Sequence, residues 1–315
     1  MIMNCIRIWI LIIGLPVLSQ GESPGISHTT GGAMPAESLR TPQGPAYPER
    51  SEIDSLPFTS FFAREVKPAA SVPCFPGAYY RKILSSEDRW LGVEGTVVLP
   101  KIVFDSARKN PAKPGQYLDN PSVYMGGNMN GQETDIGLSW SETKDADGKV
   151  STDRNAFRPF FRRSEHDGQQ PIWINAPASP QYYWYPGEEV QMSLRVISSG
   201  KVRLIVSGAG KRYEAVFDCA GYVPGDTGAF KRVDAIDQVG NEGKAVQPTR
   251  TRVLGAIWKE TNLYRSFKNQ IVTVPFGEHR YTDMRCPDPR FFDIRSTAAQ
   301  RSRGAEEINI SGSGF

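Results

Sequence analysis

The segment Gln132–Trp140 constrains the fold more than any other stretch of this chain, because its polar and apolar residues alternate. Successive side chains of a β-strand point to opposite faces, so the alternation divides the segment into two sets. One face would carry Glu133, Asp135, Gly137 and Ser139, and the other Thr134, Ile136, Leu138 and Trp140. An apolar face packs on a core, whereas a face with two carboxylates is suited to a polar groove. The segment therefore predicts a strand of a β-sandwich.

Short strand-like segments recur along the chain between turn signals. The most regular is Glu189–Ile197, which would form a hairpin with Lys201–Ser207 through Ser198-Ser199-Gly200. The other candidate strands are Val93–Leu99, Ser122–Met125, Glu133–Ser141, Phe157–Arg162, Ile172–Ile174, Tyr213–Asp218, Phe230–Val239, Arg252–Lys259, Gln270–Val274 and Glu307–Ile310. About a dozen strands predict an all-β fold, a two-sheet antiparallel jelly-roll or concanavalin-like sandwich. The segment from Ser85 to Arg89 would open a short helix at most.

The N-terminus is typical of a signal peptide, which we predict to span residues 1–21. Arg7 supplies a positive charge, Ile8–Leu18 is a short apolar run, and Ser19 and Gly21 are the small residues of a cleavage site after Gly21. A retained membrane anchor is the alternative, although the run is short for a membrane span. We expect an exported protein, secreted or periplasmic, with no stable membrane insertion after removal of the signal.

Composition separates the remaining chain into a linker and a domain. Residues 22–57 are rich in Pro, Gly, Ser and Thr and poor in apolar residues, which predicts an extended linker. Residues 58–315 would form one β-sandwich domain, and 39% hydrophobic content is enough for its core. The net charge of +3 is small for 315 residues, so we expect no nucleic-acid partner.

Export permits disulfides, and Cys5 would leave with the signal. The three remaining cysteines allow one internal bridge at most. Cys74 and Cys286 lie in proline-flanked, loop-like contexts near the two ends of the domain, and we predict that they pair. Cys219 continues an apolar alternation that begins at Tyr213, which favours a buried strand position over a catalytic thiol.

Several kinds of site lack the residues that they would need. His166 and His279 are the histidines outside the linker, too few for a zinc site, and no Gly-x-Ser-x-Gly motif supports a serine hydrolase. The sequence Asp145-Ala-Asp147-Gly148 resembles the start of a calcium loop, but Asp-Gly is also a hairpin-turn signal, and we favour the turn. No metal and no cofactor are expected.

The acidic strand is the first candidate site. Glu133 and Asp135 point the same way, and paired carboxylates are used in glycoside hydrolysis. Their spacing resembles the Glu-x-Asp-x-x-Glu strand of laminarinase-type glycosidases, which are concanavalin-like jelly rolls. That resemblance implies a nucleophile and an acid/base at the first and last carboxylates, but Leu138 or Ser139 occupies the last position here. Glu133 is the one candidate acid/base, no catalytic residue is assigned, and a solvated face of acids paired with Arg is the alternative.

The aromatic run Tyr182–Tyr185 is the second candidate site. Exposed aromatic rings stack on sugar rings, so Trp173, Tyr183 and Trp184 would serve as platforms for a ligand, with Arg232 as a partner charge. Consecutive residues of a strand face opposite ways, so about half of the run would belong to the core. A packed run that closes one end of the sandwich is the alternative.

Five segments follow one another along the middle of the chain: Gly95-Thr96-Val97-Val98-Leu99-Pro100, Tyr124-Met125-Gly126-Gly127, Glu133–Leu138, Phe230-Lys231-Arg232-Val233 and Gly255-Ala256-Ile257-Trp258. Their order resembles a secreted bacterial family of unknown function, the YrpD-like proteins. The resemblance covers residues 90–260 and implies a concanavalin-like sandwich and export. It supplies no catalytic residues.

Together these features predict a secreted, non-catalytic surface or carbohydrate-binding protein. A polysaccharide or other glycan would lie over Glu133 and Asp135. A jelly-roll glycoside hydrolase or polysaccharide lyase is the enzyme alternative, and a structural envelope or matrix protein is the third.

Overall fold

The computed structural model describes residues 61–113, 115–151 and 156–315. The predicted signal peptide, the linker and the first residues of the predicted domain lie outside the described residues. Export and signal cleavage therefore stay predictions. In the described part of the chain, no helix has the length and apolar character that crossing a bilayer requires.

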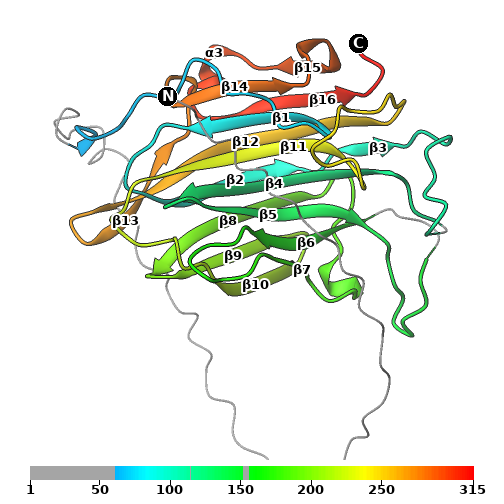
Figure 1. Cartoon of the computed structure of the whole chain (residues 1–315), viewed down its shortest axis with the longest axis horizontal. Helices are drawn as coiled ribbons and strands as arrows, with labels where there is room; N and C mark the ends of the chain where they lie inside the picture. Colours follow the sequence, from blue (N-terminus) through cyan, green and yellow to red (C-terminus); the bar gives the residue numbers. More distant parts are fainter. Residues whose placement is uncertain (1–60, 114, 152–155) are drawn as a thin grey trace, which may run out of the picture. The chain divides into compact units, whose positions relative to one another are not determined.

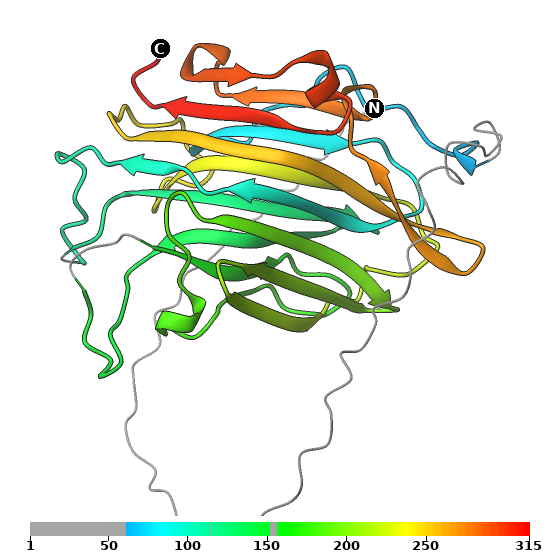
Figure 2. The ribbon, with the colours of Figure 1, turned by 180° about the vertical axis from the view of Figure 1, so that it is seen from behind.

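Two antiparallel β-sheets pack against each other, as Figures 1 and 2 show from opposite sides. Within the described residues, one sheet has seven strands in the order β14-β1-β11-β4-β5-β6-β7. Its strands are β14 (Tyr281–Cys286), β1 (Ala78–Ser85), β11 (Gly228–Gln238), β4 (Asp119–Met129), β5 (Gln132–Ser141), β6 (Ala156–Arg163) and β7 (Ile172–Asn175). This sheet carries the predicted acidic strand.

The second sheet has nine strands among the described residues, in the order β10-β9-β8-β2-β12-β16-β15, with β13 and β3 also paired to β12. Its strands are β10 (Lys211–Asp218), β9 (Lys201–Gly208), β8 (Glu189–Ser198), β2 (Trp90–Val98), β12 (Arg252–Phe267), β16 (Glu306–Ser311), β15 (Phe292–Arg295), β13 (Gln270–Pro275) and β3 (Lys101–Val103). The short helices are η1 (Pro180–Tyr182), η2 (Glu278–Arg280), η3 (Pro289–Phe291) and α3 (Ala298–Arg301). The predicted all-β sandwich is confirmed.

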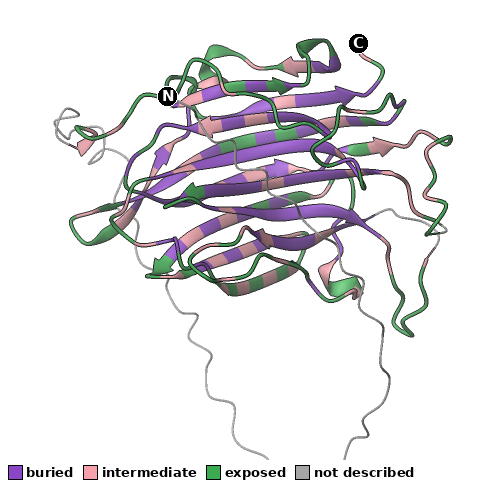
Figure 3. Ribbon diagram, in the orientation of Figure 1, coloured by how far each residue is buried: buried purple, intermediate pink, exposed green. Residues whose placement is uncertain are grey.

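The core lies between the sheets and takes one apolar face from each. Figure 3 shows that buried residues occupy most of the central strands. On β5 it receives Ile136, Leu138 and Trp140, as the alternation predicted. From β8 the core receives every second residue, namely Val190, Met192, Leu194 and Val196, and the other side chains of β8 are half-buried or exposed. The β8–β9 hairpin turns at Ser198–Lys201, also as predicted.

Four strands and one loop were not predicted correctly. The sequence did not indicate β1, β3, β14 or β15, and the segment Ser85–Arg89 continues β1 into isolated bridges rather than a helix. In β1 both faces are largely buried, and its charged residues Arg81 and Lys82 interrupt any polar–apolar alternation. Periodicity detects half-buried strands, so a strand covered on both faces escapes it.

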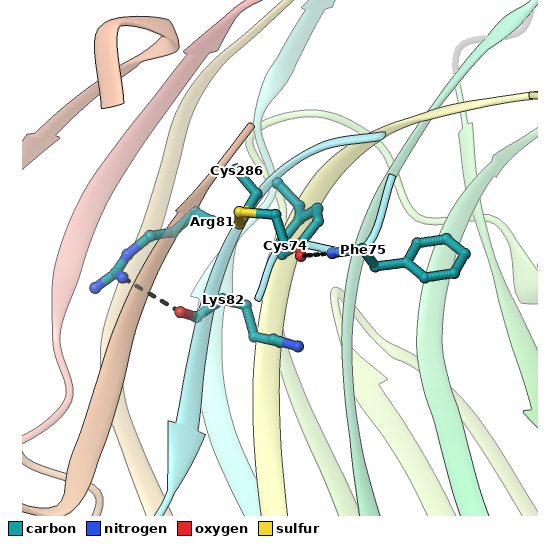
Figure 4. The surroundings of a disulfide bond; sticks show 6 residues. Cys74, Phe75, Arg81, Lys82 and Cys286 are labelled. Carbon is teal, nitrogen blue, oxygen red and sulfur yellow. Dashed lines mark hydrogen bonds between the residues drawn. A yellow bond between two sulfur atoms is a disulfide. The ribbon is translucent and has the colours of Figure 1, made fainter. Parts of the chain in front are cut away.

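A disulfide joins Cys74, before β1, to Cys286, at the end of β14, the pair preferred from the sequence (Figure 4). Beside it, the backbone N–H of Phe75 donates to the hydroxyl of Tyr80 at 2.7 Å. Cys219 is buried directly after β10, and burial raises its thiol pKa to about 12. A thiol with that pKa is not a nucleophile at neutral pH, in agreement with the buried position predicted for it.

Candidate ligand-binding face

The outer face is the name we give to the side of the seven-stranded sheet that points away from the nine-stranded sheet. The pairing register brings residues from neighbouring strands into rows across it. In one row, Asp135 on β5 lies between Arg162 on β6 and Gly126 on β4, and Gly126 lies opposite Lys231 on β11. Glu133 and Asp135 lie on this face, as the alternation predicted.

The charged row consists of Glu133, Asp135, Arg162 and Lys231. The Lys231 ammonium lies 2.5 Å from Glu133 Oε1 and 2.6 Å from Asp135 Oδ1, and Arg162 Nη1 donates to Asp135 Oδ2 at 2.5 Å. Burial raises the pKa of Asp135, but Lys231 and Arg162 outweigh it and hold that pKa below its ordinary value. Asp135 is therefore ionised and neutralised. The pairing with Arg that the alternative predicted is found for Asp135, but this carboxylate is buried rather than solvated.

An aromatic row runs beside the charged row. Tyr124 on β4 and Phe160 on β6 lie on either side of Gly137 on β5, with their ring centroids 5.7 Å apart. Trp173 on β7 stacks on Phe160, with ring centroids 5.2 Å apart and planes 14° apart. Trp173 is 57% exposed, so the row ends in an aromatic face that is open to solvent.

Hydroxyl and carboxyl groups occupy the next rows. Ser122 on β4 donates to Asp237 on β11, with an Oγ–Oδ2 distance of 2.6 Å. Burial raises the pKa of Asp237 to about 6, and the charges of Asp135 and Glu242 add to the rise. The pKa of the Tyr124 hydroxyl is also well above its ordinary value, because of burial and then the charges of Asp135 and Asp237. Tyr124 is thus a neutral hydroxyl between two carboxyl groups.

Two cations of the outer face have no acid partner. Lys82 on β1 lies in the row of Tyr124, opposite Val233, and Arg158 on β6 lies opposite Ser139. Among the described residues, neither makes an ion pair with a carboxylate, and the Nε of Arg158 is buried without a hydrogen-bond partner. Figure 4 shows Lys82 and Arg81 leaving β1 in opposite directions. Lys82 lies on the outer face opposite Val233, whereas Arg81 is buried and donates to Glu306 of the other sheet.

Arg232 does not lie on the outer face, so its predicted role as a partner charge there is wrong. Its side chain is 1% exposed and points between the sheets, where it pairs with Glu306 and donates to the carbonyl oxygen of Gly304 at 2.7 Å. Glu306 also accepts two hydrogen bonds from Arg81. Successive residues of β11 point to opposite faces of the sheet. Because Lys231 points to the outer face, Arg232, the next residue, points between the sheets.

Tyr183 and Trp184 are buried, so the prediction that they stack on a ligand is also wrong. Trp184 is 0% exposed and its indole donates to the carbonyl oxygen of Gly208 at 3.1 Å. The Tyr183 hydroxyl accepts from the backbone N–H of Lys144 at 2.9 Å. The run packs against the end of the sandwich, as the alternative reading had it, and Trp173 remains as the exposed platform.

Most of the polar and aromatic residues that surround Glu133 and Asp135 were not predicted from the sequence. The missed residues are Lys82, Ser122, Tyr124, Arg158, Phe160, Arg162, Lys231 and Asp237. On β4 the alternation Ser122, Tyr124, Gly126 was available as a signal for a second face. On β11 no signal was available, because both faces of that strand are buried.

No group of metal-ligating side chains occurs in the described part of the chain. The segment from Asp145 to Lys149 is a turn: the Gly148 N–H donates to the Asp145 carbonyl oxygen at 3.0 Å, and Gly148 has φ +78°. The turn favoured over a calcium loop is therefore confirmed. His166 lies beside Asp167 and His279 beside Arg280, each without a second histidine.

No protein-family model matches the chain, and no curated protein matches it. The YrpD-like resemblance therefore rests on the quoted segments alone and stays a prediction. Solved structures with a similar arrangement of strands do exist. Scytalido-glutamic peptidase, solved with a peptide-based transition-state analogue, aligns at a TM-score of 0.41 and 8% identity over 74% of this chain and 98% of that chain.

Two further structures show the range of proteins found. SCP-B, a member of the Eqolisin family of peptidases, aligns at a TM-score of 0.39 and 9% identity over 74% of this chain and 98% of that chain. A glycoside hydrolase family 16 endo-glucanase from Bacteroides ovatus aligns at a TM-score of 0.27 and 13% identity. The alignment covers 55% of this chain and 76% of that chain. Because these similarities are so low, no activity is transferred from them to this chain.

Proposed function

We propose that this protein binds a polysaccharide on the outer face of the seven-stranded sheet and that it acts outside the cytoplasm. The stacked pair Trp173 and Phe160 carries the proposal, because it presents an open aromatic face beside a row of fixed charges. Sugar rings stack on aromatic faces, while their hydroxyl groups bond to charged and hydroxyl side chains alongside. The signal-like N-terminus supports export.

The polar groups of the face are well placed for this role. Tyr124 and Asp237 are half-buried and can donate or accept, whereas Ser122, which bonds to Asp237, is buried. Glu133 is half-buried beside Lys231. The ion pairs hold the side chains in position before a ligand arrives, which lowers the entropic cost of binding. A preformed polar surface with one aromatic platform is the arrangement expected of a binding protein.

A carbohydrate-cleaving enzyme is the second candidate, and one observation favours it. The pKa of Asp135 is lowered whereas that of Asp237 is raised to about 6, on the same face. Environments that displace two carboxyl pKa values in opposite directions are typical of acid and base pairs in hydrolases. Glu133, the acid/base candidate from the sequence, is tied to Lys231, so Asp237 is the better candidate.

Retention on polysaccharides tests the binding proposal. In affinity electrophoresis through gels that contain one polysaccharide each, the purified protein should be retarded by at least one of them. Trp173→Ala should weaken that retention about tenfold, because stacking contributes about 1 kcal/mol beyond the area that it buries. Tyr185→Ala is the matched control, since Tyr185 is also an exposed aromatic but contacts Lys211 and Glu188 instead.

Two results would contradict the proposal: no retention on any polysaccharide, or retention that Trp173→Ala leaves unchanged. The same mixtures can be assayed for new reducing ends. If the protein produces new reducing ends and Asp237→Asn does not, the enzyme is favoured. If the protein binds a polysaccharide and produces no new reducing ends, the binding protein is favoured.

A further inference from the structure

We propose that the outer face selects acidic polysaccharides, whose carboxylate or sulfate groups are bound by Lys82 and Arg158. This inference rests on the proposed function and adds the charge of the ligand to it. It follows from the difference between the cations of this face that are already paired and those that are not.

Two of the four cations on the outer face are neutralised within the protein. Lys231 contacts both Glu133 and Asp135, and Arg162 contacts Asp135. These pairs leave no charge for a ligand to compensate. Lys82 and Arg158, in contrast, make no ion pair with any described carboxylate.

The surroundings of the two cations favour an anion. The Arg158 Nε is buried without an acceptor, and a buried unpaired donor is unfavourable until a partner arrives. Burial lowers the pKa of Lys82, and the positive charge of Lys231 adds to this effect, while the charges of Glu133 and Asp135 oppose it. Burial also lowers the pKa of Arg158, against the smaller opposing effects of Tyr183 and Glu142. The ammonium of Lys82 lies 5.6 Å from the centre of the Tyr80 ring. This cation–π contact is weaker than an ion pair with a carboxylate would be. An anionic group would satisfy both side chains.

The separation of the cations indicates a polymer rather than a single sugar. β1 and β6 are four strand spacings apart in the sheet order, which is about 19 Å at about 4.8 Å per spacing. Between them on the outer face lie Tyr124, which is half-buried, and Ser122 and Ser139, which are buried. A chain of acidic sugars that crosses the strands would meet a cation at each end.

Matched pairs of polymers separate the charge of the ligand from its sugar. We would measure binding of the full chain to polygalacturonate and to its methyl ester, and to dextran sulfate and dextran. We expect at least tenfold tighter binding to the acidic member of one pair, falling as salt is added, since exposed charges are screened. The carboxylate pair and the sulfate pair distinguish the two sources of negative charge.

Variants assign the effect to the two side chains. Lys82→Gln and Arg158→Gln should each weaken binding to the acidic polymer about tenfold and leave binding to the neutral polymer unchanged. Lys82→Arg keeps the positive charge and should retain most of the affinity for the acidic polymer. Lys268→Gln, in the exposed turn between β12 and β13, removes the same charge elsewhere and should change nothing. Thermal melting of each variant shows that it is folded.

Equal binding to the acidic and neutral members of both pairs would overturn this inference and leave the proposed function standing. So would a charge preference that survives in the Lys82→Gln/Arg158→Gln double variant. Absence of binding to every polymer would instead remove the proposed function itself.

Discussion

Single residues on the outer face differ in protonation because their immediate neighbours differ. Asp135 touches Lys231 and Arg162, and its pKa falls below the ordinary value despite burial. Asp237 is bonded to the neutral hydroxyl of Ser122, so burial and nearby acids raise its pKa to about 6. Two aspartates of one sheet face are thus in different charge states at pH 5.

The first prediction concerns the pH dependence that Asp237 causes. Its folded pKa of about 6 exceeds the unfolded value of about 3.9, so the folded protein binds more protons between these two values. The free energy of unfolding should therefore fall as pH rises through this window, by up to about 3 kcal/mol from this group. Asp237→Asn should lack that contribution, as urea unfolding at a series of pH values would measure.

The difference between the two proteins isolates Asp237, because all other titrating groups are common to both. An equal pH slope in wild type and variant would show that the Asp237 pKa is not raised. A carboxyl ¹³C titration gives the midpoint directly, and should find Asp135 ionised throughout the same range.

Within the β5 element, Gly137 holds the aromatic row together. A Cβ at this position would lie 2.5 Å from Tyr124 Cα and 2.6 Å from Tyr124 Cβ, closer than atoms pack. We predict that Gly137→Ala lowers the free energy of unfolding by about 1–3 kcal/mol, because the neighbouring strand must shift. It should also weaken ligand binding through Trp173, since Tyr124 and Phe160 support that ring.

Urea unfolding and affinity electrophoresis measure the two effects of Gly137→Ala. For the unfolding measurement Ser139→Ala is the control, because it changes the next outward position of the same strand and adds no atom. Equal stability of Gly137→Ala and wild type would contradict the close approach of Tyr124.

The sequence predicted half-buried strands such as β8 and also strands buried on both faces, such as β5 and β11. β8, β9 and β10 each alternate along one exposed and one covered face, so their residues repeat with a period of two. β1 carries Arg81 and Lys82 at buried and partly buried sites, whereas β14 alternates between covered and exposed residues, a signal that was not used. Their place in the sheet depends on contacts that periodicity does not contain.

At the scale of the whole molecule, the Cys74–Cys286 disulfide closes a loop with a sequence separation of 212 residues. We predict that Cys74→Ala/Cys286→Ala lowers the free energy of unfolding by about 2–5 kcal/mol, because a long loop gains much entropy when it is opened in the unfolded chain. A reducing agent should lower the melting temperature of the wild type and leave that of the double variant unchanged.

Cys219→Ala is the control for this experiment, and it should keep the full response to the reducing agent. A melting temperature that does not respond to reduction in wild type would contradict a stabilising role of the disulfide. Calorimetry with and without reductant makes the comparison.

The sequence by itself determined the sandwich and the outward pair Glu133 and Asp135, and it favoured the pairing of Cys74 with Cys286. These depend on local alternation and on the cysteines available, both of which are properties of the chain order. Only the tertiary structure decided that Lys231 rather than Arg232 reaches those acids, and that Trp173 rather than Trp184 is exposed. The physical reason is register: side chains from β4, β6 and β11 meet β5 only through strand pairing, which no stretch of sequence encodes alone.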